Sequence, residues 1–354
     1  MGRLLAKWLA QARFIVGALA LMLIVAAATP VLAQQPSSVN PTASSVKEDQ
    51  LFGEMNRISG RCSIPDQKAC TIEQPAGRDW REFHQKTLPW IGAIAIIGML
   101  ALLVIFYLVR GMVLIKAGRS GRTIVRFTAV ERFIHWMTAT CFIVLAVTGV
   151  NVTFGKELLL PLIGPEAFSA WAQWAKYAHN YLSFPFTIGV VLILLIWIAG
   201  NIPNAVDVEW LKRGGGIVGN DDPPAYRFNG GQKAIYWIVV LGGGAAAVSG
   251  YLLMFPFYGT GIAGMQLAQI VHGTVAVLFV AAMLAHIYIG TIGMEGAFDA
   301  MGNGEVDLNW AREHHAGWLK SEGISTDTRD GPSKVPTAAS RSRGSGHGQE
   351  AAAD

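Results

Sequence analysis

The sequence predicts an all-α integral membrane protein. Its 354 residues are 52% hydrophobic and only 15% charged, and the mean hydropathy of +0.38 is too high for a soluble domain. Five apolar stretches reach the length of about 20 residues that a helix needs to cross a bilayer. The net charge of +4 is small and gives no support for nucleic-acid binding.

Residues 1–33 have the pattern of a secretory signal peptide. Three basic residues, Arg3, Lys7 and Arg13, precede an apolar run over residues 14–28, and a site of small residues ends at Ala33. The alternative is an uncleaved anchor helix. Both interpretations place the next segment on the same side of the membrane.

Residues 34–88 are polar and are expected to form a periplasmic segment. Cys62 and Cys70 enclose a short loop, so in an oxidising compartment we expect them to form a disulfide. The chain has three cysteines and no CxxCH motif. It therefore has too few thiols to hold an iron–sulfur cluster, and it has no attachment site for a c-type haem.

Five transmembrane helices are predicted near residues 89–110, 133–152, 179–202, 234–257 and 266–294. The loop after the first contains no acidic residue and a group of basic ones, namely Arg110, Lys116, Arg119, Arg122 and Arg126. By the positive-inside rule this loop lies in the cytoplasm. The loops then alternate, so the C-terminus is cytoplasmic, and the low-complexity tail of residues 323–354 is expected to be disordered.

The last apolar stretch contains two histidines, His272 and His286. They are 14 residues apart, which places them on one helix face at a separation of about 21 Å. Ionisable groups at membrane depth usually mark a function, and imidazole is a good axial ligand for haem iron. The alternative is that each histidine is a polar side chain hydrogen-bonded to a neighbouring helix.

Partner histidines occur at matching depths. His135 lies about one turn inside the cytoplasmic leaflet on the second helix, level with His286. His179 lies near the outer face on the third helix, level with His272. The four residues therefore predict two b haems with two axial imidazoles each, in a four-helix bundle preceded by one additional helix.

Small residues beside these histidines would leave room for flat macrocycles, although small residues also favour plain helix packing in membranes. They are Thr148, Gly149, Gly189, Gly273 and Gly290.

Residues 126–322 resemble the cytochrome b (gamma) subunit of membrane-bound formate dehydrogenases. The fragments that carry the resemblance, in the family's order, are ERFIHW, AHNYLSFPF, NIPNAVDVEWL, YRFNGGQKAIYW, VHGTVAVLFVAAMLAHIYIG and WAREHHAGW. Family members have four spanning helices and two b haems, with ligands matching His135, His179, His272 and His286. The signal-like N-terminus, the outer segment and the leading helix depart from the shorter members.

The resemblance also implies a quinone site beside the cytoplasmic-side haem, formed by Asn229, Gly231, Gln232 and His286. From the residues alone, the NGGQK segment is simply a turn before a helix, with Asn and Gly there for backbone reasons. The adjacent His314 and His315 do not share a helix face and have no third ligand in view, so we expect a docking tail and no metal there.

Together these features predict a multi-pass subunit of the bacterial inner membrane. It would pass electrons from a periplasmic iron–sulfur beta subunit, supplied by a catalytic alpha subunit, through two b haems to ubiquinone or menaquinone. Formate chemistry would reside in another subunit, and this chain would carry no catalytic residue for it. Three alternatives remain: the cytochrome b subunit of a hydrogenase or thiosulfate reductase, a haem-free membrane anchor or transporter, and a stand-alone dihaem quinol oxidoreductase.

Overall fold

A computed structural model describes residues 61–62, 72–73, 75–216 and 223–324. The predicted signal peptide, the Cys62–Cys70 disulfide and the tail from residue 325 lie outside the described residues. In chain order the elements are β1 (Arg61–Cys62), β2 (Ile72–Glu73), α3 (Pro75–Glu82), η2 (Phe83–Thr87), α4 (Leu88–Arg110), β3 (Thr123–Val125), α5 (Ala129–Leu158), α6 (Leu160–Trp197), η3 (Ile198–Gly200), α7 (Ala205–Lys212), η4 (Gly214–Gly216), α8 (Gly230–Trp237), η5 (Ile238–Gly242), α9 (Gly243–Met254), α10 (Ile262–Tyr288), η6 (Ile289–Gly293), α11 (Ala297–Gly302), β4 (Glu305–Asp307) and α12 (Leu308–Ser321).

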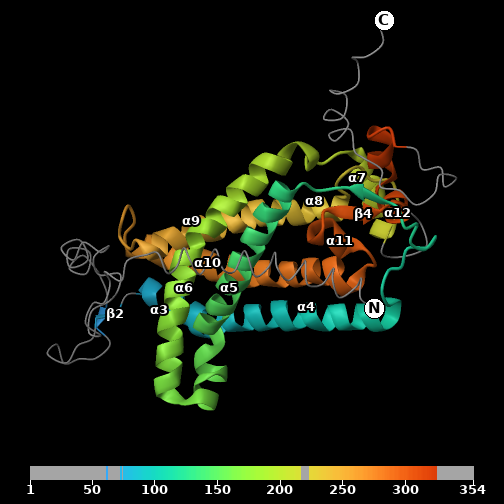
Figure 1. Ribbon diagram of the computed structural model, residues 1–354. Coiled ribbons are helices and arrows are strands. Elements are labelled where there is room, and N and C mark those ends of the chain that lie inside the picture. Colours follow the sequence, from blue (N-terminus) through green and yellow to red (C-terminus); the bar gives the residue numbers. More distant parts are fainter. Residues whose placement is uncertain (1–60, 63–71, 74, 217–222, 325–354) are drawn as a thin grey trace, which may run out of the picture.

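The predicted fold class and the five spans are confirmed. Within the described part of the chain, five helical stretches are long and apolar enough to cross a membrane: Gly77–Arg110, Ala129–Leu158, Leu160–Asn201, Gly230–Met254 and Ile262–Gly293. In Figure 1, α5 and α6 lie side by side and cross the paired helices α4 and α10 steeply.

The second and third spans are longer than the sequence predicted. Residues 153–178, expected as an outer loop, are almost wholly helical, because α6 already begins at Leu160. Gly164 has a φ of 77°, and Pro165 after it has the fixed φ that suits the first turn of a helix. The indole of Trp171 also donates a hydrogen bond to Asn151 on α5 at 2.9 Å. The two helices therefore form a hairpin, whose tip extends past the rest of the bundle in Figure 1; we call this side of the molecule the hairpin end.

The opposite side is closed by a small domain that we call the cap, made of β3, β4, α7, α11 and α12. Strands β3 and β4 pair antiparallel, with Ile124 opposite Val306, and both side chains are fully buried. They share one apolar cluster with Trp197 at the end of α6 and with Trp310 of α12. The cap thus brings together two segments that are about 180 residues apart in the sequence and attaches both to the membrane helices.

The basic loop after α4 is held against the cap by acidic residues from the C-terminal part of the chain. Arg119 pairs with Glu295 at 3.3 Å and with Asp299 at 3.1 Å. Burial alone would lower the pKa of Arg119, but the hydrogen bonds and charges of these two carboxylates outweigh burial and raise it. Glu313 accepts hydrogen bonds from the backbone of Lys116 and the residue after it.

Helix α4, the additional leading helix, packs directly along α10. A Cβ on Gly273 of α10 would lie 2.6 Å from a methyl group of Leu88, so only glycine admits α4 at this distance. Gly92 meets Phe154 of α5 and Val277 of α10 in the same way, at 3.0 and 3.1 Å. These close approaches make α4 part of the bundle.

Candidate functional site

The four histidines form two facing pairs. The rings of His135 on α5 and His286 on α10 have centroids 6.2 Å apart. The rings of His179 on α6 and His272 on α10 have centroids 6.1 Å apart. The first pair lies toward the cap and the second toward the hairpin end, so we call them the cap-side pair and the hairpin-side pair.

Hydrogen bonds orient the rings of the hairpin-side pair. The hydroxyl of Thr148 donates to the carbonyl of Val144 at 2.7 Å, so its lone pair is free to accept from His179 Nδ1 at 2.8 Å. The Nδ1 of His272 lies 3.0 Å from the carbonyl of Ala246, which can only accept, so Nδ1 carries the proton. In both rings Nε2 is then the unprotonated nitrogen, the form that ligates a metal.

The cap-side pair is arranged differently. His135 is half-buried, and its Nδ1 is buried with no hydrogen-bond partner among the described residues. His286 is exposed on the surface of the bundle. An unpartnered imidazole nitrogen at membrane depth is costly.

The spacing within each pair suits two imidazoles on one metal ion. A nitrogen–metal bond of about 2 Å and a nitrogen-to-centroid distance of about 1 Å on each side require centroids about 6 Å apart. Among the described residues, no three His, Cys, Asp or Glu side chains lie together as a metal site. Each pair therefore offers two ligands, which fits a metal whose other ligands belong to a macrocycle, as in haem.

Glycines lie against the hairpin-side rings. A Cβ on Gly250 of α9 would be 3.0 Å from the ring of His272, and one on Gly149 of α5 would be 3.4 Å from the ring of His179. Gly149 was expected beside a ligand, whereas Gly250 was missed. Gly189 packs against Thr138 and Gly273 against Leu88, so both serve helix packing, and nothing lies near Gly290.

The NGGQK segment forms the N-terminus of α8 through a reciprocal capping box. Asn229 Oδ1 accepts from the backbone N–H of Gln232 at 2.9 Å, and Gln232 Oε1 accepts from the backbone N–H of Asn229 at 3.1 Å. The turn interpretation thus accounts for both side-chain oxygens. Within the described chain, neither side-chain NH₂ group donates a hydrogen bond, so two amide donors remain available to a ligand.

The glycines of this segment admit a tryptophan. A Cβ on Gly231 would lie 2.8 Å from the indole of Trp210, and one on Gly230 would lie 3.0 Å from the same ring. The group that approaches Gly231 closely is therefore Trp210 of α7. The adjacent Lys233 pairs with Asp207 at 2.8 Å in a nearly buried ion pair, so α7 is clamped to α8 on both sides of Gln232.

Arg126 lies beside this segment and was missed as a site residue. It was expected in a cytoplasmic surface loop, but it is 3% exposed beneath aromatic rings of the cap, 5.2 Å from the ring centroids of both Trp310 and Trp318. Its Nη2 donates at 3.4 Å to Gln232 Oε1, the same oxygen that accepts from the backbone of Asn229. Burial, and next the charge of Arg227, lower the pKa of Arg126 to about 9.

The family to which the chain belongs follows from a comparison with known protein families. The sequence profile described as prokaryotic cytochrome b561 matches residues 126–304, which contain both histidine pairs. The chain belongs to the prokaryotic cytochrome b561 family. Membership in this family means that the cytochrome binds haem b.

Curated relatives are similar over the same region. The cytochrome b556(fdo) subunit of formate dehydrogenase from Escherichia coli strain K12 is 29% identical over 211 residues, which cover 58% of this chain and 97% of the relative. The nitrate-inducible b556(Fdn) subunit from that strain is 23% identical, covering 57% and 92%. The b556 subunit from Haemophilus influenzae is 26% identical, covering 57% and 84%.

Of the two adjacent histidines in α12, His314 and His315, the second has a structural role in the cytochrome. His315 is fully buried, and its Nδ1 lies 2.6 Å from the carbonyl of Tyr226. The next turn is fixed by a backbone bond from Gly317 to the carbonyl of Ala225 at 3.0 Å. These contacts fasten α12 to the segment before α8, so His315 locks the cap in place.

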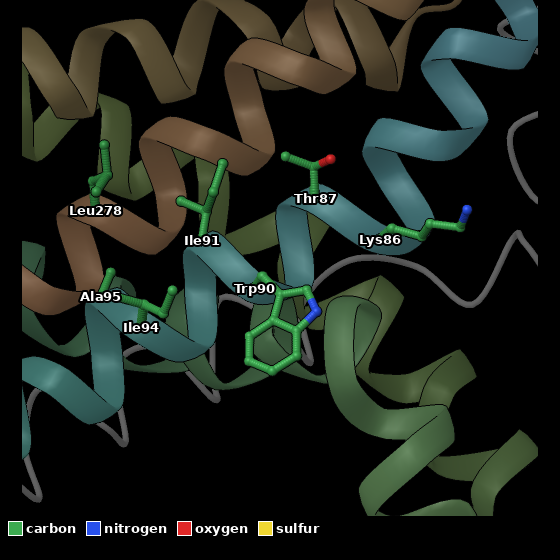
Figure 2. A pocket seen from close by; sticks show the side chains of 7 residues that line it. All are labelled: Lys86, Thr87, Trp90, Ile91, Ile94, Ala95 and Leu278. Carbon is green, nitrogen blue, oxygen red and sulfur yellow. The ribbon is translucent and has the colours of Figure 1, made fainter.

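A groove on the surface of the cytochrome is formed mainly by η2 and α4. It measures about 650 Å³ and is lined by Lys86, Thr87, Trp90, Ile91, Ile94, Ala95 and Leu278. Figure 2 shows that all of these except Leu278 belong to η2 and α4. None of the four paired histidines lines it, and it is open and apolar, as expected where helices of a membrane protein face lipid.

Proposed function

We propose that this cytochrome is the membrane subunit of a formate dehydrogenase that delivers electrons to quinone. The observation that carries the proposal is the two histidine pairs, one toward each end of the bundle, in a chain whose family binds haem b. The relatives named as formate dehydrogenase subunits support the choice of complex, since this chain covers 97% of the length of one of them.

In this proposal the hairpin end faces the periplasm of a bacterial inner membrane and the cap faces the cytoplasm. The orientation is supported by the positive-inside rule, because the basic loop between residues 110 and 126 belongs to the cap side. A periplasmic iron–sulfur beta subunit would then dock near the hairpin, and the catalytic alpha subunit would bind that beta subunit and oxidise formate.

Two b haems, when bound, supply one-electron carriers between the two ends. His179 and His272 would hold the periplasmic-side haem iron, and His135 and His286 the cytoplasmic-side haem iron. The residues fit this role because each pair presents two imidazoles at the required spacing. Thr148 would keep His179 in the ligating form through the bond to its Nδ1.

The quinone would bind beside the cytoplasmic-side haem, with Asn229 and Gln232 as donors. Their amide nitrogens are the groups left over by the capping box and can hydrogen-bond a quinone carbonyl. Gly231 contributes by letting Trp210 close one side of the segment. His286 would relay a proton through the ring nitrogen that does not bind iron.

The test is haem quantitation and redox-difference spectroscopy on the purified complex. We expect two b haems per cytochrome, and His272→Ala should remove one of them and block formate-to-quinone transfer, while formate oxidation with an artificial dye continues. His84→Ala is the matched control, because no other histidine among the described residues stacks on His84, whose ring packs on Trp80, and both haems should remain.

Two haems retained in His272→Ala would contradict the ligand assignment. A colourless purified protein would favour a membrane anchor. Copurification with the catalytic subunit of a hydrogenase or thiosulfate reductase would contradict the choice of complex.

A further inference from the structure

Three phenylalanines lie midway between the histidine pairs. On α10, Phe279 is seven residues from His272 and seven from His286. Seven residues are about two helical turns, or about 10 Å, so Phe279 shares the face of both histidines at half the distance between them. The same interval recurs on two other helices: Phe142 follows His135 on α5 by seven residues, and Phe186 follows His179 on α6 by seven.

The three rings meet. The centroids of Phe142 and Phe279 are 4.7 Å apart, and Phe186 lies 6.3 Å from Phe142 and 6.5 Å from Phe279. Phe186 and Phe279 are each only 5% exposed. They belong to one apolar cluster that also contains the buried side chains of Cys141, Val190 and Met283.

The fourth helix closes the cluster with glycines. A Cβ on Gly243 would lie 3.4 Å from the ring of Phe186, and one on Gly242 would lie 3.9 Å from the ring of Phe279. Residues 242–247 read GGGAAA and so bring no polar side chain to this level. Backbone rather than side chains therefore packs on the rings from this direction.

The hydroxyl groups nearest to Phe142 and Phe186 along the chain are engaged by their own helices. Thr140 on α5, two residues from Phe142, donates to the carbonyl of Trp136 at 2.7 Å. Thr187, next to Phe186, donates to the carbonyl of Ser183 at 2.8 Å. On α10 every residue from 275 to 283 is apolar. The nearest hydroxyl on α10, that of Thr274, has no partner among the described residues, and it lies five residues, or about 7.5 Å along the helix, from Phe279 toward His272. Within the cluster itself the thiol of Cys141 is the one polar side-chain group among the described buried members, so the level of the rings offers little to hold water.

We propose that Phe142, Phe186 and Phe279, which we call the phenylalanine layer, form a dry seal between the two haem sites. The layer lets electrons cross the middle of the membrane and keeps water and protons out. The inference rests on the proposed function, because a seal of this kind matters only if electrons cross from the hairpin end to the cap end.

The physical reason is charge separation. Each electron that crosses carries one negative charge over the membrane, and the proton that joins the quinone is taken up on the cap side. A chain of water molecules between the haem sites would let a proton follow the electron and cancel this charge. An electron crosses a packed apolar layer without any bond forming or breaking, whereas a proton needs hydrogen-bonding groups along its path.

The test uses the purified complex in sealed vesicles that contain a pH-sensitive dye, with a potassium diffusion potential to drive protons. The decisive variant is the double substitution Phe142→Ser and Phe279→Ser. Each change frees about 100 Å³, room for about three waters, and adds a hydroxyl to hold them. We expect the proton leak to rise about tenfold or more, because a hydrated polar path replaces an apolar one.

Two matched variants complete the design. Phe279→Leu keeps the layer apolar and nearly filled, so the vesicles should stay as tight as with wild type. Phe184→Ser introduces the same hydroxyl two residues from Phe186, at a side chain that is 43% exposed on the outside of the bundle, and should not leak. Haem content per protein and the reduced absorption spectrum report whether each variant is folded.

Serine variants that hold two haems and remain proton-tight would overturn the seal. If the double variant loses haem, the half-buried Phe142→Ser alone carries the test, and a tight vesicle again overturns the proposal. Failure of the proposed function is separate: it would appear in the wild-type complex as fewer than two haems, or as formate-to-quinone transfer that generates no membrane potential.

Discussion

The hydrogen bond between Thr148 and His179 offers a sharp test of the proposal that His179 is a haem ligand. Thr148 is 3% exposed, and its hydroxyl accepts from His179 Nδ1 at 2.8 Å. Thr148→Val keeps the shape and volume of the side chain but removes this acceptor. The imidazole then loses its closest hydrogen-bond partner, and only the backbone of Leu145 is left to hold the tautomer with an unprotonated Nε2.

Two independent estimates bracket the free-energy cost of this change. A buried donor left with no partner costs about 1–3 kcal/mol, which is the upper bound here because the backbone of Leu145 remains beside the ring. Loss of the group that orients a metal-bound histidine typically lowers metal affinity by about 10- to 100-fold, which is about 1.4–2.7 kcal/mol. The ligand also becomes less basic, which disfavours the ferric state, so the midpoint potential of the hairpin-side haem should rise by about 60 mV for each tenfold difference in affinity between the two oxidation states.

The assay is a redox titration of the purified cytochrome together with haem quantitation. Thr148→Ser keeps the hydroxyl and should restore wild-type behaviour. Thr140→Val removes a hydroxyl from the same helix that bonds only to the carbonyl of Trp136, and it should leave both haems unchanged. A Thr148→Val protein with wild-type haem content and potentials would refute the tautomer argument.

Three further changes test the segment before α8 and the cap. Asn229→Asp keeps the capping oxygen that accepts from Gln232 but removes the amide donor, so thermal stability should hold while quinone reduction by an artificial electron donor slows; unchanged quinone kinetics would count against Asn229 as a donor. Asp207→Asn leaves the buried ammonium of Lys233 without its counter-charge and should lower the free energy of unfolding by about 3–5 kcal/mol. Denaturation in detergent measures this loss, and a loss below about 1 kcal/mol would be the value of an exposed ion pair and would contradict the buried one. Burial lowers the pKa of His315 well below its ordinary value of 6.5. Just below pH 6.5 only the unfolded chain therefore binds a proton at this imidazole, and the free energy of unfolding should fall as the pH drops from there. His315→Gln should flatten this pH dependence, and an identical pH profile for the two proteins would contradict the assignment.

The arrangement of the histidines was largely predictable from the sequence. The apolar stretches define how deep each residue lies, and alternating directions define which histidines share a level. His135 was thus paired with His286 and His179 with His272 before any contact was known, and the structure places these rings about 6 Å apart. The rotation of each helix about its own axis does not follow from depth, so Gly250 and Ser249, which lie against His272, were missed.

The predicted start of α6 and the predicted exposure of Arg126 were both wrong, because each depends on packing against another segment of the chain. Membrane thickness limits the hydrophobic part of a helix but not the helix itself, and the hairpin partner α5 lets α6 continue as far as Leu160. Arg126 was counted with a basic surface loop, yet α12, which follows it by about 180 residues, covers it with tryptophans.

The sequence by itself determined the number of spans and the four histidines at two levels, because each of these follows from local hydrophobicity and counting along a helix. Only the tertiary structure decided which faces meet: the phenylalanine layer between the pairs, the clamp of Trp210 on Gly231, and the burial of Arg126 and His315. Those contacts depend on packing between segments far apart in the chain, and local sequence does not specify the rotation and approach of the helices that make them.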